Sequence, residues 1–260
     1  MQIVAVQLDM AWQDKPTNHQ RVRELLHKTK FEPNALIVLP EMFDTGFSMD
    51  LDKTAQTESL ESEEFVREIA AEFNAAVLAG VTAPIENGKS ANEAVAFGPD
   101  GRELVRYHKM QPFTPSGEDA KYGAGTDTQI FSWQGVKIAP FVCYDLRFPE
   151  VFRPAALGGA ELFVVIASWP EARSEHWVRL LQARAIENQA FALGVNRCGS
   201  DPSFNYDGRT TAFDPQGISF FETNADEQVC VFEIDANQAR DWRSQFPALK
   251  DSNLRYSDPT

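Results

Sequence analysis

The apolar positions of the chain fall into short runs separated by stretches of mixed polarity. Two of the runs, 35–39 and 162–167, are apolar almost without a break, which is typical of strands covered on both faces. Further strands are expected at 3–8, 76–81, 136–142, 191–195 and 229–234. Turn residues such as Pro99-Asp100-Gly101 and Pro215-Gln216-Gly217 predict two hairpins, over 94–109 and 210–221.

Three stretches carry apolar residues at helical spacing. The first follows Asn18, a candidate N-cap, the second covers 63–73, and the third runs from Ser174, another candidate cap, to residue 190. The residues expected to face inward are Val22, Leu25, Leu26, Phe65, Ile69, Phe73, Val178, Leu181, Ala185 and Ile186.

Strands that are apolar on both sides, alternating with amphipathic helices and hairpins, predict an α/β fold. Helices would cover one large mixed sheet or two stacked sheets. A long loop is expected at 111–125, which holds three glycines and two prolines, and Pro149 is expected to end regular structure. A tail at 236–260 should hold one short helix. Because no low-complexity linker interrupts the pattern, residues 1–260 are expected to form a single domain.

The composition and net charge of the chain limit the classes of binding partner that we expect. The chain has 260 residues, a formal net charge of −14 and a pI near 4.7, which argues against nucleic acid and anionic membranes as partners. A local basic site for an anionic substrate stays open. No apolar run approaches the roughly 20 residues that span a bilayer, and the N-terminus lacks the features of a signal peptide. A cytoplasmic protein is expected.

Cysteine and histidine usage bears on metals and redox state. The cysteines, Cys143, Cys198 and Cys230, are odd in number and show no CxxC pairing, so neither a disulfide framework nor a zinc site is indicated. The histidines, His19, His27, His108 and His176, are equally dispersed. We therefore expect no metal and no cofactor. Cys198 and Cys230, in apolar strand contexts, are expected to be inert core thiols.

The segment 136–149 is the strongest candidate for chemistry. Its apolar strand ends at Cys143, and Asp145 and Arg147 follow within four residues. A thiol at the junction of a strand and a loop is well placed to face a cleft. The alternative is a structural cysteine, since free cysteine is among the most buried residue types.

Other candidates also stand at or near strand ends. Glu41 follows the apolar run 35–39, Lys109 ends a hairpin strand, and Glu118 lies in the long loop. A carboxylate can accept the proton of a thiol, and a lysine can stabilise a thiolate or an oxyanion. His108 and Lys109 should face opposite sides of their strand.

Residue types alone leave a second arrangement open. Cys143 could equally form a catalytic Cys-His pair with His108 or with His176. The spacing of these residues in the sequence does not decide between such a pair and the carboxylate–lysine arrangement. Each carboxylate also has a plain reading as a solvated loop acid.

Three segments together resemble the nitrilase (carbon–nitrogen hydrolase) superfamily. They are Leu39-Pro40-Glu41, Tyr107-His108-Lys109 and the octapeptide Val-Cys-Tyr-Asp-Leu-Arg-Phe-Pro at 142–149. Landmarks between and after them extend the resemblance nearly end to end: Gly117-Glu118, 122–125, His176-Trp177, 184–188 and 214–217. Within the superfamily, 143–149, 168–177 and 183–189 resemble the omega-amidase branch, in particular bacterial 2-oxoglutaramate amidases. The resemblance implies an αββα four-layer sandwich.

The resemblance also implies roles. Cys143 would attack an amide carbonyl, Glu41 would accept the thiol proton and later protonate ammonia, and Lys109 and the backbone N–H of Tyr144 would hold the oxyanion. Glu118 matches a second glutamate of the family, which positions the lysine and the substrate. Homodimers or larger assemblies are implied by resemblance alone.

Two arginines are candidates for binding the carboxylate of the substrate. Arg147 stands where omega-amidases place a carboxylate-binding arginine, because a guanidinium grips a carboxylate through two parallel hydrogen bonds. A structural ion pair of Arg147 with Asp145 or a nearby acid is the alternative. Arg173 is a weaker candidate, since several relatives have Thr-Gly-Pro in that loop. A second departure, Gly208-Arg209-Thr210 in place of Gly-x-Ser, keeps the hydroxyl.

The expected activity is hydrolysis of the terminal amide of a small dicarboxylic monoamide, such as 2-oxoglutaramate or 2-oxosuccinamate. An N-carbamoyl amino acid amidohydrolase or an aliphatic amidase is the alternative with the same chemistry. Nitrile hydrolysis is less favoured, and an interaction module with a vestigial site is the non-enzymatic alternative.

Overall fold

The first of two central sheets is built from strands that the apolar runs predicted. The computed structural model describes residues 1–252. The strands of this sheet are β1 (Gln2–Gln7), β2 (Leu36–Val38), β3 (Ala76–Thr82), β4 (Ser90–Phe97), β5 (Glu103–His108), β6 (Tyr122–Gly123) and β15 (Gln228–Glu233). They lie in the order β15-β1-β2-β3-β4-β5, and β6 pairs with β4.

The second sheet contains the strand that leads to Cys143. Its strands are β7 (Phe131–Trp133), β8 (Val136–Val142), β9 (Leu162–Ala167), β10 (Phe191–Asn196), β13 (Thr211–Phe213) and β14 (Ser219–Glu222). They lie in the order β14-β13-β10-β9-β8-β7. A separate two-stranded ribbon consists of β11 (Cys198–Ser200) and β12 (Asn205–Asp207).

Both sheets are mixed. In the first, β1, β2 and β3 run parallel, and in the second, β8, β9 and β10 run parallel. Antiparallel strands flank each parallel group, and both predicted hairpins are present, as β4–β5 and β13–β14. Parallel strands place their carboxyl ends at one edge, which is where Glu41, Cys143 and Ser168 emerge.

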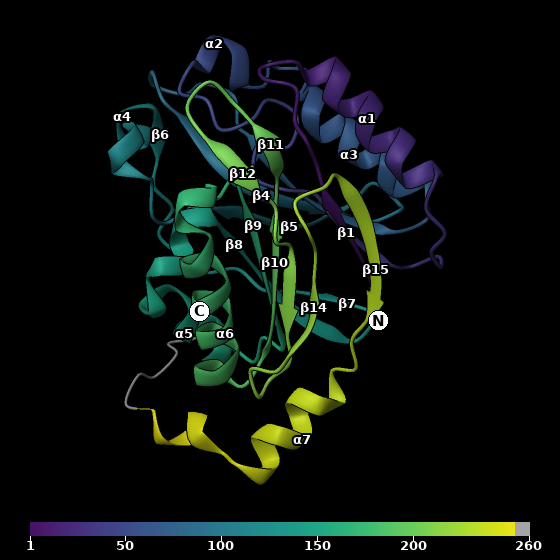
Figure 1. The fold of residues 1–260 in the computed structure, drawn as a ribbon, viewed down its shortest axis with the longest axis vertical. Helices are drawn as coiled ribbons and strands as arrows, with labels where there is room; N and C mark the ends of the chain where they lie inside the picture. The colour runs from purple at the N-terminus through teal and green to yellow at the C-terminus, as the bar shows by residue number, and fades with distance from the viewer. Residues whose placement is uncertain (253–260) are drawn as a thin grey trace.

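The chain has seven α-helices and four short 3-10 helices among the described residues. The α-helices are α1 (Lys15–His27), α2 (Leu51–Thr54), α3 (Glu61–Glu72), α4 (Glu118–Lys121), α5 (Pro149–Leu157), α6 (Ser174–Asn188) and α7 (Asn237–Gln245). The 3-10 helices are η1 (Thr114–Ser116), η2 (Cys143–Arg147), η3 (Glu171–Arg173) and η4 (Ala248–Asp251). In Figure 1, α1 and α3 lie together on one side of the molecule and α5 and α6 on the other.

Strand alternation explains why the layers form. Along β1, Ile3 and Ala5 belong to the core cluster between the sheets, whereas Val4 and Val6 pack with the residues of α1 and α3. Residues of α5 and α6 belong to the same cluster as Ile3 and Ala5, together with the strands of the second sheet. Because both faces of the central strands are covered, their sequences are apolar throughout. The predicted αββα sandwich of two stacked mixed sheets is therefore confirmed.

Two helix boundaries differ from the predictions. Helix α1 begins before Asn18: the cap is Asp14, whose carboxylate accepts from the N–H of Thr17, and Asn18 is buried inside the helix. Asn18 donates to the carbonyl of Asp44 instead. Ser174 is the first residue of α6 and makes no cap hydrogen bond. Ile186 was predicted to face inward, but it is half exposed.

The two predicted interruptions are partly wrong. Pro149 does not end regular structure but begins α5, since the first turn of a helix has no use for the N–H that proline lacks. The stretch 111–125 is not a plain loop, because it holds η1, α4 and β6. The tail holds the expected short helix as α7, followed by η4. Its last part, 253–260, lies outside the described residues.

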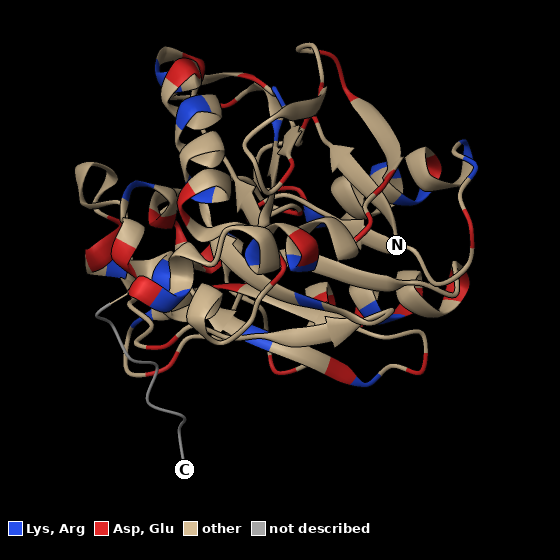
Figure 2. Cartoon of the chain, turned by 90° about the horizontal axis from the view of Figure 1, so that it is seen from below, with Lys and Arg blue, Asp and Glu red and all other residues tan. Residues whose placement is uncertain are grey.

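None of the described helices is long and apolar enough to cross a membrane. Acidic and basic residues are interspersed over the helices and loops on the side of the molecule that Figure 2 shows.

Candidate active site

The segment after β2 brings Glu41 into the interior. Glu41 is fully buried, and its loop packs tightly against β3: the N–H of Gly80 donates to the carbonyl of Pro40, and the N–H of Phe43 to the carbonyl of Gly80. A Cβ on Gly80 would lie 2.5 Å from the Cα of Glu41. Only glycine therefore allows the loop to approach this closely.

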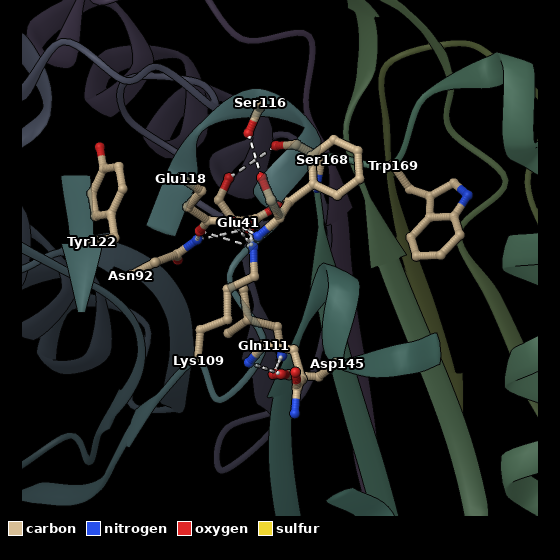
Figure 3. A network of polar contacts seen from close by, with 12 residues as sticks. Glu41, Asn92, Lys109, Gln111, Ser116, Glu118, Tyr122, Asp145, Ser168 and Trp169 are labelled. Atoms are coloured by element: carbon tan, nitrogen blue, oxygen red, sulfur yellow. Dashed lines mark hydrogen bonds and ion pairs between the residues drawn. The ribbon is translucent and has the colours of Figure 1, made fainter. Parts of the chain in front are cut away.

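Glu41, Lys109 and Glu118 meet in one buried cluster, which Figure 3 shows from close by. The Nζ of Lys109 lies 2.9 Å from Oε1 of Glu41 and 2.9 Å from Oε2 of Glu118. The N–H of Ser168 donates to Oε2 of Glu41 at 2.8 Å. The amide of Asn92 donates to Oε1 of both glutamates. Residues from distant parts of the sequence, between positions 41 and 168, thus form a single network.

The charges of this cluster hold Lys109 in its cationic form. Burial alone would lower the pKa of Lys109, but the carboxylates of Glu118 and Glu41 outweigh burial and raise the pKa. The lysine is therefore an ammonium at neutral pH.

Cys143 stands directly beside this cluster, at the first position of η2 after β8. Its φ of 47° lies in the left-handed region, as for a residue presented on a sharp turn. The side chain is almost entirely buried. Burial raises the pKa of the thiol well above its ordinary value, and the charge of Glu41 raises it further, while Lys109 opposes them. At rest the site therefore holds a neutral thiol next to a carboxylate that can accept its proton.

Asp145 ties the turn of Cys143 to the strand that carries Lys109. Its carboxylate accepts from the hydroxyl of Tyr107 at 2.8 Å, from the N–H of Gln111 at 2.9 Å and from the N–H of Val142 at 3.0 Å. Burial nevertheless raises the pKa of Asp145 to about 7. The predicted structural alternative for Arg147, an ion pair with Asp145, is not formed.

A cavity opens over Cys143. Its lining combines the thiol with aromatic side chains and both predicted arginines: Phe47, Phe113, Cys143, Tyr144, Arg147, Ser168, Trp169, Pro170, Arg173, Phe204 and Tyr206. The guanidinium of Arg147 lies 4.9 Å from the ring centre of Trp169, and that of Arg173 lies 5.4 Å from the ring centre of Phe113. Within residues 1–252, neither guanidinium forms an ion pair. Both are thus available to an anion in the cavity.

The two histidines that could have paired with Cys143 lie elsewhere. His108 is half exposed and contacts Glu93 at 2.8 Å, and this hydrogen bond raises its pKa. It faces away from the buried Lys109, as strand alternation predicted. The Nδ1 of His176 lies 3.2 Å from Nη2 of Arg147. The structure therefore places carboxylates and a lysine beside the thiol, and neither histidine.

Several residues of the site were missed by sequence reasoning. Asn92 and Ser168 donate directly to Glu41, yet Asn92 precedes the predicted hairpin 94–109 and Ser168 was noted only as part of the segment 168–177. Residue type did not single out Asn92, because its neighbours Ser90 and Glu93 are polar too. The motif 184–188 has a visible role as well, since Arg184 donates to the carbonyl of Leu146 at 2.7 Å and thereby supports the turn after Cys143.

The other two cysteines are buried without an acid–base partner of this kind. Burial raises the pKa of Cys198 to about 12 and that of Cys230 to about 11. A raised pKa therefore does not separate Cys143 from them; the adjacent carboxylate and ammonium do. No group of three or more His, Cys, Asp or Glu residues within 1–252 is arranged to hold a metal ion.

Comparison with known proteins agrees with this geometry. Residues 2–244 match the family of carbon–nitrogen hydrolases. The chain is 35% identical to the omega-amidase YafV of Escherichia coli over 97% of both chains, and 30% identical to a 2-oxoglutaramate amidase of Bacillus subtilis over 96% of both chains. A solved CN-hydrolase superfamily protein from Xanthomonas campestris is 32% identical and superposes with a TM-score of 0.91 over 99% of each chain. The chain belongs to the carbon–nitrogen hydrolase family and is a hydrolase of carbon–nitrogen bonds.

Proposed function

We propose that the protein hydrolyses the terminal amide of a small dicarboxylic monoamide, such as 2-oxoglutaramate or 2-oxosuccinamate. The observation that carries this proposal is the cavity, in which the thiol of Cys143 and the guanidinium groups of Arg147 and Arg173 line the same space. Relatives named omega-amidase and 2-oxoglutaramate amidase support it. In this proposal one end of the substrate is an amide at the thiol and the other is a carboxylate at an arginine.

The proposed reaction begins with proton transfer. Glu41 accepts the proton of the Cys143 thiol while sulfur bonds to the amide carbon, and the carbonyl oxygen becomes an oxyanion. Lys109 and the backbone N–H of Tyr144 stabilise this oxyanion. Because the resting thiol is neutral, transfer to Glu41 accompanies attack, and no free thiolate has to accumulate.

Collapse of the tetrahedral intermediate breaks the carbon–nitrogen bond. Glu41 returns the proton to the departing nitrogen, so ammonia leaves and a thioester remains on Cys143. Water then attacks the thioester, with Glu41 again accepting a proton. Release of the carboxylic acid product restores the thiol. Glu118 contacts Lys109 through both of its carboxylate oxygens, which suits a role in positioning the ammonium.

The lining of the cavity favours an oxo acid over an amino acid. None of its lining residues is Asp or Glu, whereas two are arginines. An α-ammonium group, as in glutamine, would therefore meet positive charge without a counter-charge on the wall. A 2-oxo group carries no charge and can accept a hydrogen bond. Aromatic side chains on the remaining wall suit a short apolar carbon chain.

The alternative substrate, an N-carbamoyl amino acid, shares the carboxylate and would use the same arginines. An aliphatic amide or a nitrile would leave both guanidinium groups without a partner. Ammonia release measured side by side from 2-oxoglutaramate, an N-carbamoyl amino acid, butyramide and a simple nitrile separates these substrates. The proposal expects the highest kcat/KM for the oxo-amide, and a higher value for any of the others contradicts it.

We also propose that the chain forms a single domain and acts in the cytoplasm as a homodimer or a larger homo-oligomer. Exposed Ile186 and Ile218 support self-association: 51% and 60% of their surfaces are accessible, and Gly217 packs directly against Ile186. Light scattering coupled to size exclusion tests this proposal, and a monomer at micromolar concentration contradicts it.

A further inference from the structure

Asn92 connects the two glutamates of the buried cluster. It lies in β4 and is 1% exposed. Its Nδ2 lies 2.8 Å from Oε1 of Glu41 and 2.9 Å from Oε1 of Glu118, and Figure 3 shows its amide pointing at both carboxylates. Since carboxylate oxygens only accept hydrogen bonds, the nitrogen of the amide must face them, with one N–H for each glutamate.

We propose that Asn92 is a positioning residue that fixes Glu41 and Glu118 around Lys109, so that Glu41 presents one oxygen to the thiol of Cys143. This inference rests on the proposed role of Glu41 as the base. The Oε1 of Glu41 accepts from Asn92 and from Lys109, and Oε2 accepts from the N–H of Ser168. Donors on both oxygens hold the carboxylate in one orientation.

The main chain of Asn92 adds a second contact to the same cluster. Its carbonyl accepts from the N–H of Lys109 at 2.9 Å. One residue therefore holds the backbone of the lysine and the side chains of both glutamates. A substitution of the side chain leaves this backbone contact in place, so that it tests the two carboxylate contacts alone.

Folding alone does not account for an asparagine at this position. Its Oδ1 is buried and has no hydrogen-bond partner among residues 1–252. A buried polar atom without a partner costs stability, whereas an apolar side chain of similar size would not. The contacts of its nitrogen with the two carboxylates supply the reason for retaining the amide.

Thr82 offers a matched control. It pairs with Asn92 directly across the two strands, it is equally buried at 1% exposure, and its Oγ1 also has no partner among the described residues. It forms no hydrogen bond with either carboxylate. Thr82→Val therefore removes a buried polar group of the same sheet and no hydrogen bond of the cluster.

The test compares Asn92→Ala, Asn92→Asp and Thr82→Val in the full chain, with kcat and KM for 2-oxoglutaramate measured across pH. We expect Asn92→Ala to lower kcat by on the order of tenfold to a hundredfold, as for residues that orient the ligands of a reactive centre. KM should change little. The acidic limb of the pH profile should move to higher pH, because fewer donors stabilise the ionised carboxylates. Thr82→Val should match the wild type.

Comparing the activity losses of the two Asn92 variants distinguishes a positioning role from a packing role. Aspartate keeps the shape of asparagine but replaces both donors with a third carboxylate facing Glu41 and Glu118, so Asn92→Asp should lose more activity than Asn92→Ala. A packing role predicts the reverse order, because alanine leaves a cavity. That reverse order, or an unchanged pH profile in folded Asn92→Ala, overturns the proposal. If Asn92→Asp does not fold, the pH profile of Asn92→Ala still decides.

A second readout needs no substrate. Alkylation of Cys143 by iodoacetamide, followed across pH, reports on the thiol and on the titratable groups that act on it: Glu41, Lys109, Glu118 and Tyr206. We expect Asn92→Ala to shift this profile and Thr82→Val to leave it in place. Absence of turnover on every amide would contradict the proposed function, whereas an unshifted alkylation profile would contradict the role of Asn92.

Discussion

The main-chain N–H of Ser168 lies 2.8 Å from Oε2 of Glu41, and this hydrogen bond joins the two sheets of the sandwich. Ser168 follows β9 of the second sheet, and Glu41 follows β2 of the first. The proposed base is therefore oriented from the side of the nucleophile, by a group that does not depend on the identity of a side chain. The carboxylate of Glu41 accepts hydrogen bonds from N–H groups of Ser168, Asn92 and Lys109.

This arrangement predicts the behaviour of Glu41→Gln. The amide nitrogen of glutamine would face a donor in either orientation, and the amide cannot accept the thiol proton. We expect kcat to fall by roughly 10²–10⁴-fold, the range for loss of a general base, while the circular dichroism spectrum stays that of the wild type.

Glu93→Gln is the matched control for this variant. Glu93 is also buried, but it binds Arg106 and His108 on the opposite side of β4. Its replacement should lower thermal stability and leave kcat near the wild-type value. Comparable kcat losses in both variants would argue against Glu41 as the base.

Lys109 forms buried ion pairs with Glu41 and Glu118. Their contribution to stability can be tested by comparing a single variant with a double variant. Lys109→Met leaves the carboxylates of Glu41 and Glu118 without their counter-ion, so we expect a loss of about 3–5 kcal/mol in the free energy of unfolding. Adding Glu118→Gln should restore part of this stability and none of the activity, since one buried charge is removed while the oxyanion donor stays absent. Urea denaturation and ammonia release measure the two effects; a double variant that is less stable than Lys109→Met would contradict the charge argument.

Asp145 predicts a pH dependence of stability. Its pKa is about 7 in the folded protein, against 3.8 for an ordinary aspartate, so the folded state binds the proton more tightly than the unfolded state. This contribution is fully present below about pH 4 and is lost as pH rises through about 7. By the shift of roughly three units, it amounts to at most about 4 kcal/mol.

Asp145→Asn removes this titration. The variant should be less stable at every pH, because an amide cannot accept from all three donors, and its unfolding free energy should fall less steeply between pH 4 and 7. Denaturation curves at several pH values give both slopes. Parallel slopes for wild type and variant would mean that Asp145 does not titrate in this range.

Arg147 predicts selective loss of carboxylate substrates. Arg147→Ala should lower kcat/KM for 2-oxoglutaramate by about tenfold to a hundredfold, the equivalent of hydrogen bonds to a charged group, mainly through a higher KM. Arg147→Lys should recover little, because an ammonium cannot form two parallel hydrogen bonds. Activity on butyramide should be retained.

Arg153→Lys provides the comparison for Arg147. Arg153 lies on α5 and donates to the carbonyl of Glu187, away from the residues that line the cavity. It should leave both substrates unaffected. An equal loss on butyramide and 2-oxoglutaramate in Arg147→Ala would show that Arg147 does not read the carboxylate.

Much of the fold could be predicted from the sequence because buried strands consist of runs of apolar residues. The strands Val136–Val142 and Leu162–Ala167 have the predicted boundaries, since both strands are covered on both faces along most of their length and every position except Lys137 is apolar. Helix starts were harder. Asp14 and Asn18 are both good cap residues, and only tertiary contacts, such as the hydrogen bond of Asn18 to Asp44, decide between them.

Some residues of the site could also be predicted from the sequence, whereas others could not. Glu41, Lys109, Glu118 and Cys143 stood out through the family resemblance, and the structure brings them together. Asn92 did not stand out, because its side chain gains a role only when β4 lies between two glutamates that are 51 and 26 residues away in the chain. The backbone donor of Ser168 leaves no trace in its residue type. Such contacts cannot be inferred from positions along the chain, because they form only when the chain folds.

The most direct test of the account is ammonia release from 2-oxoglutaramate by the wild type, Cys143→Ala and Arg147→Ala, with butyramide as the neutral amide. We expect release by the wild type, none by Cys143→Ala, and a raised KM in Arg147→Ala for 2-oxoglutaramate only. Turnover that survives in Cys143→Ala would contradict the proposed chemistry, and equal KM values for wild type and Arg147→Ala would contradict the proposed recognition of the carboxylate.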